Sequence, residues 1–145
     1  MRDVYESTAR ALIVFGPLVL CAAGVGERFY HCVGGHIEPG ETPLRAVIRE
    51  VQEEIGLPPG NQIIWRALTV LPALWQRGTD LVHETLHLYA ATGFAPAWKQ
   101  WEPLPLSSER QTQLRWASVD DLVYRRVVLQ PPALLPWIIH LRGRG

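Results

Sequence analysis

One stretch, from Gly35 to Leu57, constrains the fold of this chain more than any other. It begins with a glycine-rich segment, which we expect to form a loop. Thr42 then offers a helix N-cap, and Pro43 suits the first helical position, where a backbone N–H would be unpaired anyway. Gly56 stands where helices commonly end in a left-handed conformation. The sequence therefore predicts a loop followed by a helix over residues 43–55.

This helix is predicted to have an apolar side and an acidic side. At roughly 100° per residue, one arc that we expect to face the core holds Leu44, Val47, Ile48, Val51 and Ile55. Glu50, Glu53 and Glu54 gather on another side, where neighbouring like charges cost about 0.2–0.5 kcal/mol per pair. Arg49, four residues before Glu53, can hold one of these carboxylates. A hard divalent cation, which takes oxygen ligands, would balance the rest, whereas a solvated charged face is the alternative interpretation.

The same stretch resembles the Nudix box, Gly-x5-Glu-x7-Arg-Glu-U-x-Glu-Glu-x-Gly-U, in which U is aliphatic. The chain has the required residue at every specified position of this pattern: Gly35, Glu41, Arg49, Glu50, Val51, Glu53, Glu54, Gly56 and Leu57. The resemblance implies the Nudix fold of the α+β class, a mixed β-sheet sandwiched between helices. It also implies that residues 1–145 form a single Nudix hydrolase domain.

The resemblance further implies a Mg²⁺-dependent pyrophosphohydrolase, with Mn²⁺ as an alternative ion. Its substrate would be a small nucleotide, a nucleoside diphosphate linked to another moiety. Glu50, Glu53 and Glu54 would be metal ligands together with the backbone carbonyl of Gly34, and one of these glutamates would also accept the proton of the attacking water. Arg49 would orient Glu53 through a charge-assisted hydrogen bond. A catalytically silent nucleotide-sensing module and an RNA 5′-end pyrophosphohydrolase are the alternatives.

Candidate substrate-binding residues also lie beyond the acidic side of the predicted helix. Glu84 follows His83 at the start of a predicted strand, and a His-Glu pair in that place is frequent in the family that the chain resembles. Trp75 offers a surface on which a base could stack. His36 follows the glycine pair and could contact phosphate. Some family members use a glutamate from a later loop as base or extra ligand, and Glu102 and Glu109 are the candidates here. The structural alternatives are a core aromatic residue, a hydrogen-bonded surface histidine and solvated loop carboxylates.

Apolar alternation and turn residues predict the remaining elements. Strands are predicted at residues 8–15, 18–23, 28–33, 62–70, 83–92 and 111–118. Residues 71–80 read as a loop or strand end, and residues 93–110 as an irregular connection. A short helix is predicted to begin near Asp120, and a C-terminal helix to run from Pro131 to about Leu141. This mixed order suits a sheet with helices on both sides.

Composition narrows the remaining function classes. The 14 basic residues balance the 14 acidic ones, which argues against a broad nucleic-acid-binding surface. Cys21 and Cys32 stand in apolar stretches and are expected to be buried free thiols. The apolar run at residues 11–23 is too short to span a bilayer and is divided by Gly16-Pro17, so we expect a cytoplasmic protein without a membrane span. A homodimer is compatible with so apolar a small chain.

Overall fold

The computed structural model describes residues 1–24, 28–55, 63–92 and 112–142. Its centre is a seven-stranded sheet in the order β2-β3-β4-β1-β6-β5, with β7 paired to β3. The strands are β1 (Arg2–Leu12), β2 (Val14–Phe15), β3 (Leu18–Gly24), β4 (His31–His36), β5 (Ile64–Arg77), β6 (Asp80–Thr92) and β7 (Thr112–Ser118). β1 and β6 run parallel and the other pairs run antiparallel, so the predicted mixed sheet is confirmed.

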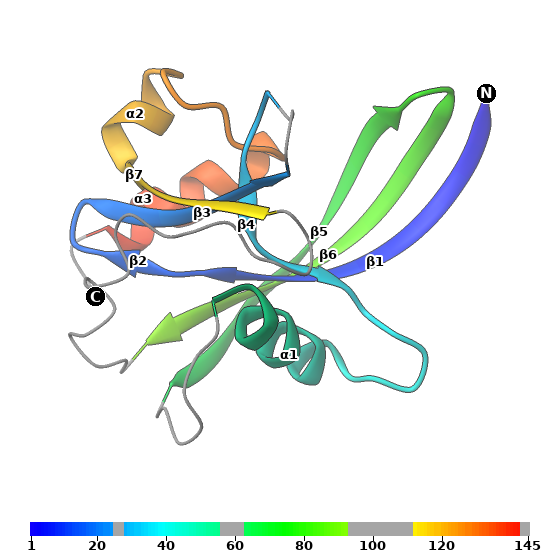
Figure 1. The fold of residues 1–145 in the computed structure, drawn as a ribbon, viewed down its shortest axis with the longest axis horizontal. Helices are drawn as coiled ribbons and strands as arrows, with labels where there is room; N and C mark the ends of the chain where they lie inside the picture. Colours follow the sequence, from blue (N-terminus) through cyan, green and yellow to red (C-terminus); the bar gives the residue numbers. More distant parts are fainter. Residues whose placement is uncertain (25–27, 56–62, 93–111, 143–145) are drawn as a thin grey trace.

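Helices cover both faces of the sheet (Figure 1). Helix α1 (Pro43–Ile55) lies on one face, where its Val47 and Val51 join Ala9 and Ala11 of β1 in one apolar cluster. Helices α2 (Val119–Val123) and α3 (Leu135–Leu141), with the 3₁₀ turn at Pro132–Leu134, contribute to a second cluster that contains Leu12 of β1. Successive residues of a strand point to opposite faces, so β1 serves both clusters at once. The predicted sheet between helical layers is confirmed.

Strand β4 connects two parts of this sheet. Among the described residues it pairs with β3 at His31 and Cys32, and with β1 from Val33 to His36. The sheet therefore opens beyond Cys32, where β4 leaves β3 and continues beside β1. The glycine pair lies within this part of β4, so the prediction of a glycine-rich loop was wrong at Gly34 and Gly35.

Close approach of neighbouring groups explains why a strand contains two glycines here. A Cβ atom on Gly34 would lie 2.1 Å from the carbonyl oxygen of Ala9, and the φ of Gly34 is +147°. A Cβ atom on Gly35 would lie 2.6 Å from the carboxylate of Glu50 in α1. Glycine thus lets both β1 and α1 approach the backbone of β4.

The hairpin of β5 and β6 is longer than predicted. Residues 71–80 were predicted as a loop or strand end, but β5 continues to Arg77, and Gly78 and Thr79 turn the chain into β6. Pairing with β6 along the whole hairpin overrides the local signal of Pro72, which an edge strand tolerates. Parallel pairing with β6 also extends β1 back to Arg2, six residues before its predicted start.

Helix α1 has the predicted bounds, but its predicted core side was partly wrong. Val47 and Val51 are fully buried. Two residues predicted to face the core are exposed instead, Leu44 and Ile48. Glu50 and Glu54 take their place against the sheet, with relative exposures of 1% and 7%. Buried carboxylates are costly unless they are paired or bind a metal, so this side of α1 marks a candidate site.

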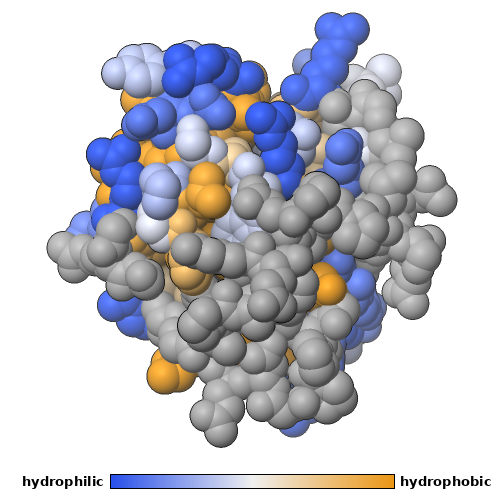
Figure 2. All heavy atoms as spheres, turned by 60° about the vertical axis from the view of Figure 1, so that its left-hand side comes forward, coloured by the Kyte–Doolittle hydropathy of each residue, from blue (hydrophilic) through white to orange (hydrophobic). Residues whose placement is uncertain are grey.

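Two further predicted elements differ in their bounds. The strand predicted at residues 28–33 is β4 at His31–His36, and the C-terminal helix predicted from Pro131 consists of the 3₁₀ turn at Pro132–Leu134 followed by α3. Cys21 and Cys32 are buried free thiols, as predicted. Within the described ranges, each helix is too short or too polar to traverse a bilayer. On the face that Figure 2 brings forward, hydrophilic side chains cover much of the described surface and hydrophobic ones show between them.

Candidate functional site

Helix α1 begins where the sequence predicts, and its start fixes the position of the acidic residues. The backbone N–H of Arg45 donates to Oγ1 of Thr42 at 3.2 Å, which satisfies one of the unpaired donors of the first turn. Apolar packing against β1 and β4 then sets the rotation of the helix. This rotation turns Glu50 and Glu54 toward β4, and it leaves the side chain of Glu53 one-third exposed.

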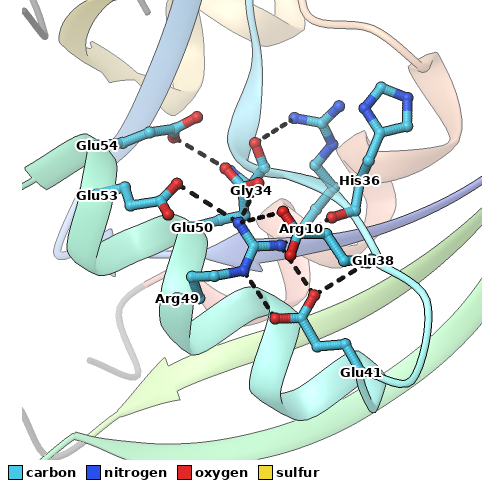
Figure 3. Close-up of polar contacts among 9 residues, drawn as sticks. All are labelled: Arg10, Gly34, His36, Glu38, Glu41, Arg49, Glu50, Glu53 and Glu54. Carbon is cyan, nitrogen blue, oxygen red and sulfur yellow. Dashed lines mark hydrogen bonds and ion pairs between the residues drawn. The ribbon is translucent and has the colours of Figure 1, made fainter. Parts of the chain in front are cut away.

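Arg49 is the centre of a polar network along this edge (Figure 3). Its guanidinium donates to both oxygens of Glu41, from Nε at 2.7 Å and from Nη2 at 2.9 Å. Its Nη1 donates to Glu50 at 3.0 Å and to Glu53 at 3.4 Å, and Nη2 also reaches the carbonyl of His36 at 3.1 Å. The expected contact between Arg49 and Glu53 is present, but the bidentate pair with Glu41 is shorter.

This pairing changes the ionisation of Glu41. The hydrogen bonds from Arg49, supported by the backbone N–H of Glu38, lower the pKa of the Glu41 carboxyl from 4.5 to about 2. The same contacts with Glu41, followed by those with Glu50, raise the pKa of Arg49. Both groups therefore stay charged at neutral pH, and Glu41 acts by fixing the guanidinium that in turn holds Glu50 and Glu53.

The two buried glutamates of α1 contact the glycine pair of β4. Oε2 of Glu54 accepts a hydrogen bond from the backbone N–H of Gly34 at 3.3 Å. The carboxylate of Glu50 occupies the space that a side chain at residue 35 would fill. The structure therefore brings two of the predicted metal ligands, Glu50 and Glu54, to the glycine pair. The third predicted ligand, the carbonyl of Gly34, accepts a hydrogen bond from Arg10 instead.

The donor set fits a hard divalent cation. Four carboxylates, those of Glu38, Glu41, Glu50 and Glu53, lie within 4.0 Å of the single guanidinium of Arg49, so negative charge exceeds positive charge there. Oxygen ligands of this kind suit Mg²⁺. The acidic side chains do not converge on one point, and within the described ranges no three acidic, histidine or cysteine side chains are arranged to hold an ion. Reorientation of these side chains would be needed for binding, and the metal role of these residues stays a prediction.

Two predicted substrate-binding residues, Trp75 and Glu84, contact each other. Nε1 of Trp75 on β5 donates to Oε1 of Glu84 on β6 at 3.1 Å. Oγ1 of Thr8 on β1 donates to the other oxygen of Glu84, whose relative exposure is 9%. These hydrogen bonds satisfy the buried carboxylate and fix the indole ring. Arg77 lies over that ring, 5.4 Å from its centroid.

His36, at the end of β4, is connected to the β5–β6 hairpin through Glu6 of β1. Its Nε2 lies 3.0 Å from Glu6 on β1, and Nη2 of Arg77 donates to Glu6 at 2.7 Å. Partial burial alone would raise the pKa of Glu6, but the hydrogen bonds from Arg77 and His36 outweigh it and lower that pKa. Contact of His36 with phosphate stays a prediction. The predicted Glu102 and Glu109 lie outside the described residues.

Sequence reasoning missed Arg10, whose guanidinium lies beside the glycine pair. Nη1 of Arg10 donates to the carbonyl of Gly34 at 3.0 Å and to that of Cys32 at 3.2 Å. In Figure 3 the side chains of Arg10 and Glu54 reach Gly34 from opposite sides. The available signal was a charged residue between Ala9 and Ala11, directly before the apolar run at residues 11–15.

Comparison with known proteins assigns this chain to a family. The model of the NUDIX domain matches residues 8–138. Over 35 residues the chain is 65% identical to the 8-oxo-dGTP diphosphatase of Escherichia coli (strain K12). This aligned stretch covers 24% of the chain. The chain thus spans only about a quarter of the length of that curated relative, 27%.

Solved structures are similar over nearly the whole chain. The MutT protein from Bacillus halodurans has a TM-score of 0.67 at 20% identity, covering 93% of this chain and 82% of its own. The E. coli ORF135 protein has a TM-score of 0.60 at 21% identity, covering 97% of this chain and 93% of its own. At these identities the similarity supports the fold.

Proposed function

The chain belongs to the NUDIX family, and from this premise we propose that it is a Mg²⁺-dependent pyrophosphohydrolase that cleaves a nucleoside diphosphate linked to another group. The observation that carries the proposal is the contact of α1 with β4. There Glu50 and Glu54 lie against Gly35 and Gly34, while Glu53 extends beside them toward solvent. These three carboxylates would hold a divalent cation, which would supply positive charge to the diphosphate.

Each residue has a distinct part in the proposed reaction. Glu50, Glu53 and Glu54 would hold the cation, which would neutralise charge on the phosphate oxygens and lower the pKa of the attacking water. The Gly34 carbonyl, predicted as a further ligand, accepts a hydrogen bond from Arg10 and would have to turn from it to join them. Glu53 is a third exposed and therefore has room to turn toward a water molecule and accept its proton. Arg49 holds Glu50 and Glu53 through its fork of donors.

The substrate class we propose first is a nucleoside triphosphate carrying an oxidised base. The support is the short, highly identical stretch shared with an 8-oxo-dGTP diphosphatase. Nucleotide sugars and ADP-ribose are the next compounds to compare. The residues of the Nudix box would act on the diphosphate and do not determine which group is attached to it. The cytoplasmic location and the homodimer predicted from the sequence also stay proposals.

The test is turnover of a nucleotide panel in the presence and absence of Mg²⁺. We expect wild-type protein to release a mononucleotide and a phosphate product, and chelation by EDTA to stop the reaction. Glu53→Gln and Glu54→Gln should each lower kcat by about 100-fold or more, since each removes a charge that the transition state needs. Gln52→Ala, an exposed change on the same helix, is the matched control and should keep full activity.

Three outcomes would contradict the proposal in different ways. Equal turnover by the wild type and both glutamine variants would exclude the box as the active site. Nucleotide binding by calorimetry without any product would favour a silent sensing module. Cleavage of 5′-triphosphorylated RNA in preference to all small nucleotides would favour the RNA-end alternative.

A further inference from the structure

Among the described residues, Arg10 and Arg49 are the half-buried arginines, and the others are exposed. The surroundings of these two guanidinium groups differ. Arg49 faces four carboxylates within 4.0 Å. Within the described residues Arg10 has no carboxylate partner, and its contacts are the carbonyls of Cys32 and Gly34 and Nδ1 of His31. A half-buried guanidinium without a counter-charge is costly, and an anionic ligand would relieve that cost.

The hydrogen bonds of Arg10 also leave donors for a ligand. All of its contacts with described residues use Nη1: the Gly34 carbonyl at 3.0 Å, and the Cys32 carbonyl and the His31 ring at 3.2 Å. Its Nε and Nη2 donate to none of the described residues. These donors belong to the planar fork with which arginine binds two oxygens of a phosphate.

The position of Arg10 places this fork beside the proposed active site. Arg10 pairs with Gly34 across β1 and β4, at the place where β4 has left β3 and the sheet opens. Gly34 contacts Glu54 through its N–H and Arg10 through its carbonyl. One residue therefore separates the acidic edge of α1 from an unneutralised positive charge.

We propose that Arg10 is a further substrate-binding residue, which binds oxygen anions of the diphosphate group of the substrate. This inference rests on the proposed function for the identity of the anion. The guanidinium holds the Gly34 and Cys32 carbonyls through Nη1 and presents Nε and Nη2 to the phosphate oxygens. Arg10 thus adds positive charge on the side of Gly34 opposite to the carboxylates.

The test measures binding of inorganic pyrophosphate by calorimetry, at low salt with EDTA present. Arg10→Gln should weaken this binding about ten-fold or more, because a charge-assisted bidentate contact is lost. The affinity of the variant should also depend less on salt than that of the wild type. Arg2→Gln is the matched control, since Arg2 lies on the same strand and is already paired with Asp80 at 2.9 Å. It should leave the affinity unchanged.

Several outcomes of this binding experiment would contradict the inference. Unchanged pyrophosphate affinity in Arg10→Gln, or equal losses in Arg10→Gln and Arg2→Gln, would overturn it. An unchanged pyrophosphate affinity with weaker binding of deoxyguanosine would indicate contact with the base and would also overturn it. If Arg10→Gln does not fold by circular dichroism, Arg10→Lys takes its place, keeps the charge without the fork, and should weaken binding several-fold. Wild-type protein that binds pyrophosphate through Arg10 but cleaves nothing in the panel would refute the proposed function and leave this inference standing.

Discussion

Replacing Gly35 by alanine should inactivate the site while leaving the protein folded. The added Cβ would lie 2.6 Å from Cδ and Oε1 of Glu50 and 2.8 Å from Oε2, whereas ordinary contacts begin near 3.4 Å. The carboxylate must therefore move by roughly 1 Å, and a displacement of that size at an active site costs about 100-fold in rate. The far end of a side chain can move without unfolding the strand, so we expect the free energy of unfolding to fall by only about 1–2 kcal/mol.

Gly34→Ala provides the contrast, because there the obstacle is backbone. Its Cβ would lie 2.1 Å from the carbonyl oxygen of Ala9, at a φ of +147° that side chains rarely adopt. We expect a loss of about 4 kcal/mol or more in the free energy of unfolding. Gly78→Ala is the control, because its Cβ would meet nothing within 4 Å and only the positive φ of 60° opposes it, at a cost of about 1 kcal/mol.

The assay combines kcat for Mg²⁺-dependent hydrolysis with urea unfolding of each variant. Gly35→Ala that keeps more than half of the wild-type kcat would refute the reasoning, and so would a loss of stability equal to that of Gly34→Ala. Combining Gly35→Ala with Glu50→Gln tests the cause. If the alanine acts through Glu50, the double variant should be no slower than Glu50→Gln alone, since effects through one group are not additive.

Three further predictions concern the hydrogen bonds around the site. Glu41→Gln should lower the free energy of unfolding at pH 7. The pKa of Glu41 is about 2 in the folded protein and 4.5 ordinarily, so the carboxylate stabilises the fold only where it is charged. The difference in free energy of unfolding between variant and wild type should therefore be full above about pH 4.5 and vanish as the pH falls toward 2. Urea unfolding across pH 2.5–7 measures it, with Glu38→Gln, whose nearest contact with Arg49 is 3.9 Å, as the control that should show a much smaller difference. Arg49→Lys should lower kcat about ten-fold or more in the hydrolysis assay, because an ammonium cannot hold Glu41 and the box glutamates with one fork. Thr8→Val should lower the free energy of unfolding in urea by about 1–3 kcal/mol by removing a donor from buried Glu84, and Thr8→Ser, which keeps the hydroxyl, should not.

Local sequence signals predicted the helix of the box well. Thr42, Pro43 and Gly56 are start and stop signals that need no knowledge of the rest of the fold, and α1 has the predicted bounds Pro43–Ile55. The core side of α1 was harder to predict, because hydrophobic periodicity assigns apolar residues to the core. Here the sheet side of the helix holds Glu50 and Glu54, and Leu44 is exposed. Such a departure from periodicity is typical of functional sites and agrees with the proposed role of these glutamates.

Features set by long-range pairing were the ones that the sequence could not predict. The glycine pair looked like a loop, yet β1 pairs with it and makes it part of β4. Arg10 carried no local signal of a role, and its proposed role depends on contact with Gly34, 24 positions away. Similarly, Trp75 and Glu84 were predicted separately, and only the β5–β6 hairpin brings their side chains into contact.

The charges around Gly34 favour a ligand that carries both signs. On one side, Arg49 cannot balance the carboxylates that surround it, and on the other side Arg10 faces carbonyl oxygens. The backbone N–H of Gly34 donates to Glu54, and its carbonyl accepts from Arg10. The excess negative charge and the excess positive charge are therefore close in space, on the two sides of Gly34. A cation alone would satisfy the acidic side and an anion alone would satisfy Arg10. A cation bound to a diphosphate would satisfy both, so the excess charges on the two sides of Gly34 agree with the proposed function.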